Sequence, residues 1–231
     1  MTAVLVSLLA CLYPPAAPTT TAFQPLNPLV GSWKGTGNPE GSREERQKGF
    51  WTETIAWEWR FEKGDAWLAV KFDNGKHFTR GDLRYLPEMK QFQFTATTPD
   101  KREVVYVGTL SPGKLKEQIL TLTRQDAKSS EESRLVLTLL HHNRFLYRME
   151  SRPAGSSTAF TKQFQVGATK EGEAFADVGT GPECIVSGGQ AKIPVTFQGK
   201  TYYVCCTGCR DEFKANPEKY VKEYEAKQSK K

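Results

Sequence analysis

Hydrophobic and polar residues alternate with a period of two through most of the segment between Asn27 and Ala168. In the run Trp51–Phe61, most odd positions carry Trp, Ile or Phe, whereas most even positions are Thr, Glu or Arg. Successive side chains of a strand point to opposite faces of a sheet, so this pattern predicts a strand with one buried face. Similar runs follow at Ala66–Phe72, His77–Tyr85, Phe92–Thr97, Val104–Leu110, Ile119–Thr123, Leu135–Leu140, Phe145–Met149 and Phe160–Val166.

Turn-forming residues separate these runs. Asn74-Gly75 and Pro112-Gly113 are typical of tight connections, and no helical pattern lies between the runs. Eight or nine short strands at this spacing predict an antiparallel barrel or sandwich. The sequence therefore predicts a mainly β fold, with one antiparallel domain at residues 27–168.

The opening of this segment favours a barrel. Gly31-Ser32-Trp33 follows a short 3₁₀-like entry and resembles the Gly-x-Trp that begins lipocalin-like (calycin) barrels, here of the DUF1579 or nitrobindin-like kind. That resemblance implies that Trp33 closes one end of the barrel. It also implies a possible small apolar ligand inside, such as a lipid or haem.

The chain changes character after the barrel. Residues 169–183 are rich in Gly and have no sustained period, so they are expected to form a linker. Residues 184–231 contain two short strands around Gln198-Gly199, then an amphipathic helix, then a second helix that Asn216-Pro217 begins. The second domain is thus predicted to be a small α+β module, a β-hairpin plus two short helices with a basic tail.

Four of the five cysteines lie in this module: Cys184, Cys205, Cys206 and Cys209. A module of about 45 residues buries too little apolar surface to be stable alone. Thiolates at Cys-x3-Cys, with a third from a distant loop, suit Zn²⁺ or a softer ion. A helix is also expected to follow Cys209, and its N-terminal dipole would lower the pKa of that thiol.

The module resembles a YHS/TRASH domain. The resemblance rests on Cys184 and Gly188-Gly189, on the run from Tyr202 to Phe213, and on Asn216–Tyr220. It implies a transition metal ion, zinc or copper, held by Cys184, Cys205 and Cys209, with Cys206 as a further candidate. Family members often have Met after the first Cys, whereas Ile185 stands here. The alternatives are two disulfides, in three possible pairings, or free thiols.

The N-terminus predicts export. Residues 1–22 contain a short apolar run and end at a small-residue cleavage site, Thr20-Thr21-Ala22, as in a signal peptide. Cys11 lies in a sequence that loosely resembles a lipoprotein box, which would make it a lipid anchor and the only membrane attachment. The protein is therefore expected to be periplasmic, secreted or lipid-anchored at the cell envelope.

Charge gives no reason to expect nucleic acid as a partner. The net charge is +6, and residues 184–231 carry nine Lys or Arg against five Asp or Glu, with much of this positive charge in the terminal tail.

His77, at the start of a predicted strand, is interpreted as a hydrogen-bonded strand residue rather than a haem ligand. Glu53, on the apolar face of its strand, is expected to be a buried carboxylate.

No catalytic arrangement is recognisable, so the sequence predicts a binding protein and no enzyme. The leading hypothesis is an exported protein that binds a transition or heavy metal ion through its cysteine cluster, as a carrier, scavenger or sensor. The alternative is a barrel that carries a small apolar ligand, lipid or haem, with the cysteine module as a structural staple.

Overall fold

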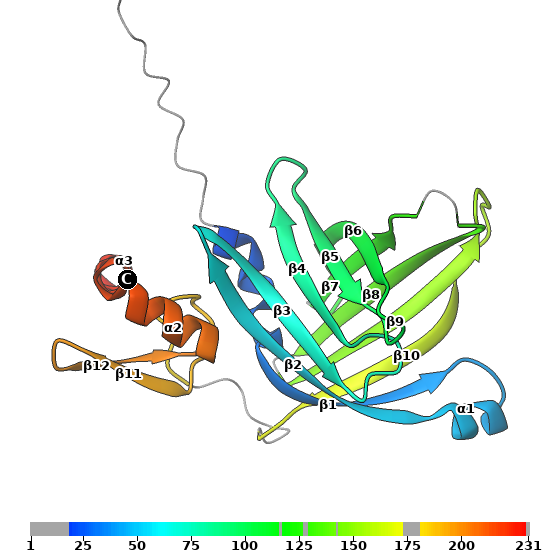
Figure 1. Cartoon of the computed structure of the whole chain (residues 1–231), viewed down its shortest axis with the longest axis horizontal. Coiled ribbons are helices and arrows are strands. Elements are labelled where there is room, and N and C mark those ends of the chain that lie inside the picture. The colour runs from blue at the N-terminus through cyan, green and yellow to red at the C-terminus, as the bar shows by residue number, and fades with distance from the viewer. Residues whose placement is uncertain (1–18, 116, 127–128, 142, 173–180, 230–231) are drawn as a thin grey trace, which may run out of the picture.

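The computed structural model describes residues 19–115, 117–126, 129–141, 143–172 and 181–229. It contains a closed antiparallel barrel of ten strands, β1 to β10, and a C-terminal module that lies beside it (Figure 1). A 3₁₀ helix, η1 (Thr19–Leu29), precedes the barrel, and a short helix, α1 (Arg43–Gly49), lies between β1 and β2. The strands are β1 (Gly31–Pro39), β2 (Trp51–Glu62), β3 (Asp65–Asp73), β4 (Arg80–Leu86), β5 (Gln91–Thr97), β6 (Glu103–Pro112), β7 (Gln118–Arg124), β8 (Glu131–His141), β9 (Arg144–Pro153) and β10 (Thr161–Lys170).

The prediction of a mainly β, barrel-type fold is confirmed. Each strand pairs with its neighbours along the chain, and β1 pairs with both β2 and β10, which closes the barrel. In β2 the buried positions alternate with less buried ones, as the period-two pattern requires. Glu53 lies on the buried face, where it accepts hydrogen bonds from the Tyr147 hydroxyl (2.5 Å) and from Trp51 Nε1 (3.0 Å).

Apolar side chains of η1 close one end of the barrel. Phe23, Leu26 and Leu29 are fully buried there. Trp33 Nε1 donates a buried hydrogen bond of 2.7 Å to the Leu29 carbonyl, which ties η1 to the first residues of β1. Trp33 thus lies at the barrel end, where the Gly-x-Trp resemblance placed it.

The barrel interior is filled by side chains. Its cavity measures about 10 Å³ and is lined by aliphatic and aromatic residues, among them Trp57, Phe78 and Leu120. A volume of this size holds about one water molecule. In this conformation the interior has no space for a lipid or haem.

The strand pattern missed three features. α1 was not predicted, and β10 continues two residues past the predicted boundary at 168, so that Thr169 and Lys170 belong to a strand and not to the linker. His77 lies in the bend before β4, not in a strand, and its ring stacks on Phe164 with centroids 3.7 Å apart. Burial, and then the charge of Lys76, lowers the His77 pKa to about 4.

The C-terminal module contains the predicted hairpin and two helices. A hairpin of β11 (Ile193–Phe197) and β12 (Lys200–Val204) is followed by α2 (Thr207–Ala215) and α3 (Pro217–Gln228). Phe213 and Tyr220 are buried, and they belong to one hydrophobic cluster that also includes residues of the barrel and η1. α2 begins before Cys209, so this residue lies in the first turn of the helix rather than ahead of it.

The module packs directly against the barrel. β1 pairs with β2 only as far as Trp57, so the last residues of β2 extend beyond this partner. There the Trp59 amide donates to Cys206 Sγ (3.4 Å), and the Thr207 hydroxyl donates to the Glu58 carboxylate (3.0 Å). A Cβ atom on Gly208 would lie 1.8 Å from the Trp59 carbonyl oxygen, so only glycine allows this approach. The two domains therefore share a tight interface.

Several predictions fall on residues outside the described ones. These are the apolar part of the signal sequence with Cys11 and the middle of the linker, residues 173–180. The predicted cleavage site at Ala22 lies within η1, next to the fully buried Phe23. No helix in the described ranges is long and apolar enough to span a membrane.

Candidate metal centre

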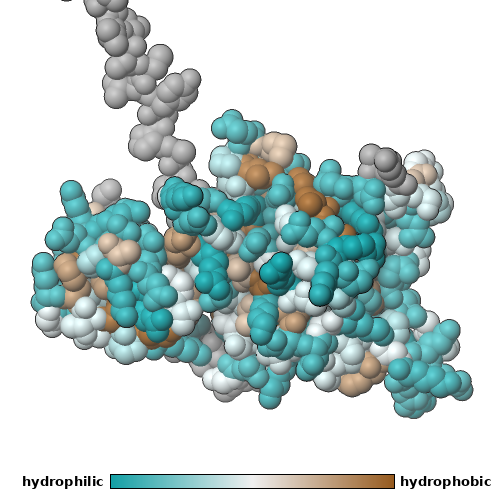
Figure 2. Space-filling model, in the orientation of Figure 1, coloured by the Kyte–Doolittle hydropathy of each residue, from teal (hydrophilic) through white to brown (hydrophobic). Residues whose placement is uncertain are grey.

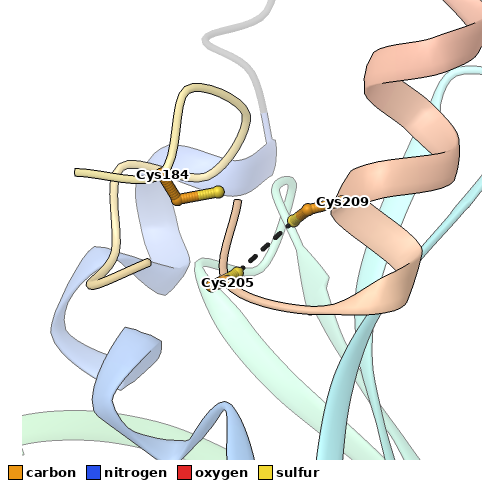
Figure 3. Close-up of side chains that lie close together, drawn as sticks. All are labelled: Cys184, Cys205 and Cys209. Carbon is orange, nitrogen blue, oxygen red and sulfur yellow. Dashed lines mark hydrogen bonds between the residues drawn. The ribbon is translucent and has the colours of Figure 1, made fainter. Parts of the chain in front are cut away.

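Three cysteine sulfurs meet at one point of the module. The sulfur atoms of Cys184, Cys205 and Cys209 all lie within 4.8 Å of one another (Figure 3). Cys205 Sγ and Cys209 Sγ are 3.5 Å apart. Cys184 and Cys209 are buried and Cys205 is partly buried, so water has little access to the cluster. The three sulfurs that the resemblance selected are thus brought together by the fold.

Local structure explains how residues far apart in the chain converge. Cys205 follows β12, and its hairpin partner β11 continues the loop that carries Cys184. This loop is a tight turn, in which the Cys184 amide donates to the Gly189 carbonyl (2.6 Å) and the Gly188 amide donates to the Cys184 carbonyl (2.8 Å). Gly188 has a φ of +74°, which a glycine adopts without strain.

Ser187 connects the cluster to the barrel. Its amide donates to Cys184 Sγ (3.5 Å), and its hydroxyl lies 3.4 Å from Cys205 Sγ. Its carbonyl accepts hydrogen bonds from Asn27 Nδ2 (3.0 Å) and Gln24 Nε2 (2.9 Å), both in η1. One buried serine therefore contacts two of the three sulfurs and is itself held by the helix that closes the barrel.

Cys206 has a different position from the other three. It is the N-cap of α2, where its sulfur accepts from the Cys209 amide (3.5 Å) as well as from the Trp59 amide. Its sulfur lies 3.9 Å from Cys205 Sγ but is not part of the three-sulfur group. Cys206 thus caps a helix and joins the module to β2.

Hydrogen bonds divide the four sulfurs into two kinds. The pKa of Cys184 is lowered, because the Cys205 and Cys209 thiols and the Ser187 side chain and amide donate to it. The pKa of Cys206 is lowered for a similar reason, with thiols and two backbone amides as donors. The pKa of Cys205 is raised, mainly because its thiol donates to Cys184. Hydrogen bonding therefore favours the thiolate form at Cys184 and Cys206 and the thiol form at Cys205.

The expected effect of the helix dipole on Cys209 was wrong. Burial, followed by hydrogen bonding to the neighbouring sulfurs, raises the Cys209 pKa well above its usual value. The thiol that the start of α2 does favour as a thiolate is Cys206, the N-cap. Burial is the largest cause because Cys209 is fully buried.

None of the four cysteines of the module forms a disulfide in the described structure. Thiolate sulfur is the ligand that Zn²⁺, Cu⁺ and heavier soft ions prefer. A cation that binds the cluster would displace the protons of the remaining thiols and compensate the buried negative charge. The donor set and its burial fit a metal ion.

The family comparison agrees with this geometry, with residues 186–224 matching the YHS domain. Residues 186–224 are a YHS domain. Cys184 lies two residues before the matched range, yet its sulfur belongs to the same cluster as Cys205 and Cys209. The YHS domain and its cysteine cluster together suggest metal binding.

Among solved structures the chain is similar to Rv2717c from M. tuberculosis, with a TM-score of 0.44 and 16% identity, over 65% of this chain and 97% of that one. No curated protein matches the sequence. The nitrobindin-like or DUF1579 character of the barrel remains a prediction.

Sequence reasoning missed the residues that support the cluster. Ser187, Asn27 and Trp59 contact it or hold it from outside the cysteine motif. Ser187 could have been noticed because it lies between Cys184 and the Gly188-Gly189 turn. Nothing local in the sequence connects Asn27 or Trp59 to a site about 150 residues away.

Proposed function

We propose that the protein binds a thiophilic transition or heavy metal ion, zinc or copper in the first instance, through Cys184, Cys205 and Cys209. The observation that carries this proposal is the convergence of three sulfurs within 4.8 Å in a buried position. Among the three proposed ligands, Cys184 has a lowered pKa, which provides one of the thiolates that such an ion requires. We further propose that Cys206 is structural and not a ligand.

The role is that of an exported binding protein: a carrier, scavenger or sensor rather than an enzyme. Export rests on the apolar run and small-residue site of residues 1–22. In an oxidising compartment four exposed cysteines would form disulfides readily. Burial of Cys184, Cys206 and Cys209 supports a site in which bound metal and not a disulfide protects the sulfurs.

The rival function, a barrel that carries an apolar ligand, finds less support in this structure. The interior cavity is about 10 Å³, whereas ligand sites are usually about 300 to 1,000 Å³. A lipid or haem could enter only if several core side chains moved. We therefore place the function in the YHS domain.

A metal titration tests the proposal. The full-length protein, reduced and metal-free, would be titrated with Cu⁺ and separately with Zn²⁺, with elemental analysis to give the stoichiometry. One equivalent should bind to the wild type, Cys205→Ser should lose most of the affinity, and Cys206→Ser should retain it. Equal losses in the two variants would indicate a four-sulfur site, and no binding to fully reduced wild type would refute the proposal.

A further inference from the structure

The short helix α1 has no role in the core. None of its residues is buried, and in Figure 2 the lobe at its position is covered mainly by hydrophilic residues. It is held by a capping box: the Glu45 amide donates to Ser42 Oγ (3.2 Å), and the Ser42 amide donates to the Glu45 carboxylate (2.7 Å). Isolated helices of seven residues are marginal in water. Packing in the core therefore does not account for α1, and its role must lie in its exposed side chains.

One face of α1 borders a groove on the outside of the barrel. Arg43, Arg46 and Gln47 are three and four residues apart, which places them on the same face of the helix. They line a groove of about 850 Å³, and Arg144 of β9 and Lys162 of β10 line it as well. This volume lies within the usual range of ligand sites.

The groove carries uncompensated positive charge. Among its lining residues the only carboxylate is Glu40, which pairs with Lys162 at 3.1 Å. Within the described part of the chain, no carboxylate oxygen lies within 4.0 Å of the guanidinium groups of Arg43, Arg46 and Arg144. Three planar cations around one hollow are suited to carboxylate groups, which guanidinium binds with two parallel hydrogen bonds.

The floor of the groove is open because Gly167 has no side chain. It pairs with Thr36 of β1 and Leu146 of β9, so it lies in the middle of the three strands that form the floor. A Cβ atom at Gly167 would meet only Leu146 Cδ2, at an ordinary 3.5 Å. A larger residue there would fill the groove without a clash against the backbone.

We propose that this groove binds an acidic segment of a partner protein, with carboxylates that pair with Arg43, Arg46 and Arg144. Its polar lining residues are half-buried or exposed, so it lacks the buried polar anchor of a site for a small anion. Its concave shape keeps Arg144 on the barrel wall away from a flat lipid surface. The cations lie on separate elements, α1 and β9, which suits an elongated ligand with several carboxylates.

Binding of a fluorescent octaglutamate peptide to the full-length protein, measured by anisotropy at low salt, tests the proposal. The triple variant R43A/R46A/R144A should lose about tenfold in affinity, since three exposed ion pairs are removed. Gly167→Leu should weaken binding too, although it removes no charge. The matched control, K219A/K222A/K227A in α3, removes the same charge elsewhere and should bind like the wild type.

Four outcomes would overturn the proposal. An equal loss in the α3 control would mean that the peptide responds to net charge alone. Binding unchanged by Gly167→Leu would mean that the peptide does not lie in the groove. Citrate that competes as well as the peptide, or vesicles with anionic lipid that bind through the same three arginines, would identify a different ligand. The metal site does not contribute to this test, so its result is independent of the proposed metal binding.

Discussion

Replacing Gly208 with alanine is expected to separate the YHS domain from the barrel. The new Cβ would lie 1.8 Å from the Trp59 carbonyl oxygen, whereas Cβ atoms in proteins keep at least 3.0 Å from such atoms. The neighbouring atom is backbone and cannot rotate away. α2 and β2 must therefore move apart by at least 1.2 Å, the difference between the two distances.

The loss of interface free energy follows from the contacts that this movement breaks. The hydrogen bonds from Trp59 to Cys206 and from Thr207 to Glu58 have lengths of 3.4 and 3.0 Å and would not survive such a shift. Two hydrogen bonds at about 0.5 to 1 kcal/mol each, with about 1 to 2 kcal/mol for the strain of overpacking, give a loss of about 2 to 4 kcal/mol. Alanine is a better helix former than glycine, so α2 itself should not be weakened.

Amide hydrogen exchange at Trp59 is the direct measurement. Its N–H points to Cys206, beyond the end of the β1 pairing, so its protection reports on the domain contact. A loss of about 2 to 4 kcal/mol corresponds to exchange about 30- to 1,000-fold faster. Gly167→Ala is the control, because the space at that site accepts a Cβ. If the Trp59 amide remains as protected in Gly208→Ala as in the wild type, the described interface is wrong.

Three further predictions concern the two domains separately. Cys209→Ser should lower metal affinity and partly unfold residues 184–224, since binding energy is folding energy in so small a domain; unchanged metal content and circular dichroism would contradict this. The barrel alone, residues 19–172, should show a β-type circular dichroism spectrum and melt cooperatively, because it keeps the closing helix η1 and all ten strands; a non-cooperative melt would show that the two domains form one core. The half-buried, neutral His77 has a pKa of about 4 against 6.5 unfolded, so stability should fall as pH decreases from 6.5 to 4. Urea unfolding at pH 7 and pH 5 should show a smaller difference for His77→Phe, and an equal difference would exclude His77 as the cause.

The barrel could be predicted because each strand carries its own signal. In β2 the alternation of Trp57 and Trp59 with Glu58 and Arg60 reflects one buried and one exposed face, which is a local property. α1 has no apolar face and therefore no periodic signal. The capping box of Ser42 and Glu45 was the available clue, and it applies to surface helices regardless of burial.

The resemblance to a YHS domain identified the three candidate metal ligands from the sequence, whereas only the folded structure shows the burial and hydrogen bonds of their sulfurs. Cys209 illustrates the difference. Its place near a helix start suggested a lowered pKa, but full burial dominates and raises it. Burial depends on contacts with residues far away in the chain, which spacing does not reveal. The same reason explains why Asn27 and its bond to Ser187 were not predicted.

The contact between Trp59 and Cys206 indicates that the Gly-rich linker does not make the two domains energetically independent. The Trp59 N–H, at the end of β2, lies beyond the last residue that pairs with β1, so β1 offers it no carbonyl acceptor. Burying this amide under the module without an acceptor would cost free energy. The Cys206 sulfur satisfies it, and in return the N–H helps to lower the Cys206 pKa. A charged acceptor makes this hydrogen bond stronger than one to a neutral thiol. The barrel therefore donates a hydrogen bond to the sulfur next to the cluster, while η1 holds Ser187 against two of the three candidate ligands, so the proposed metal site rests on residues of both domains.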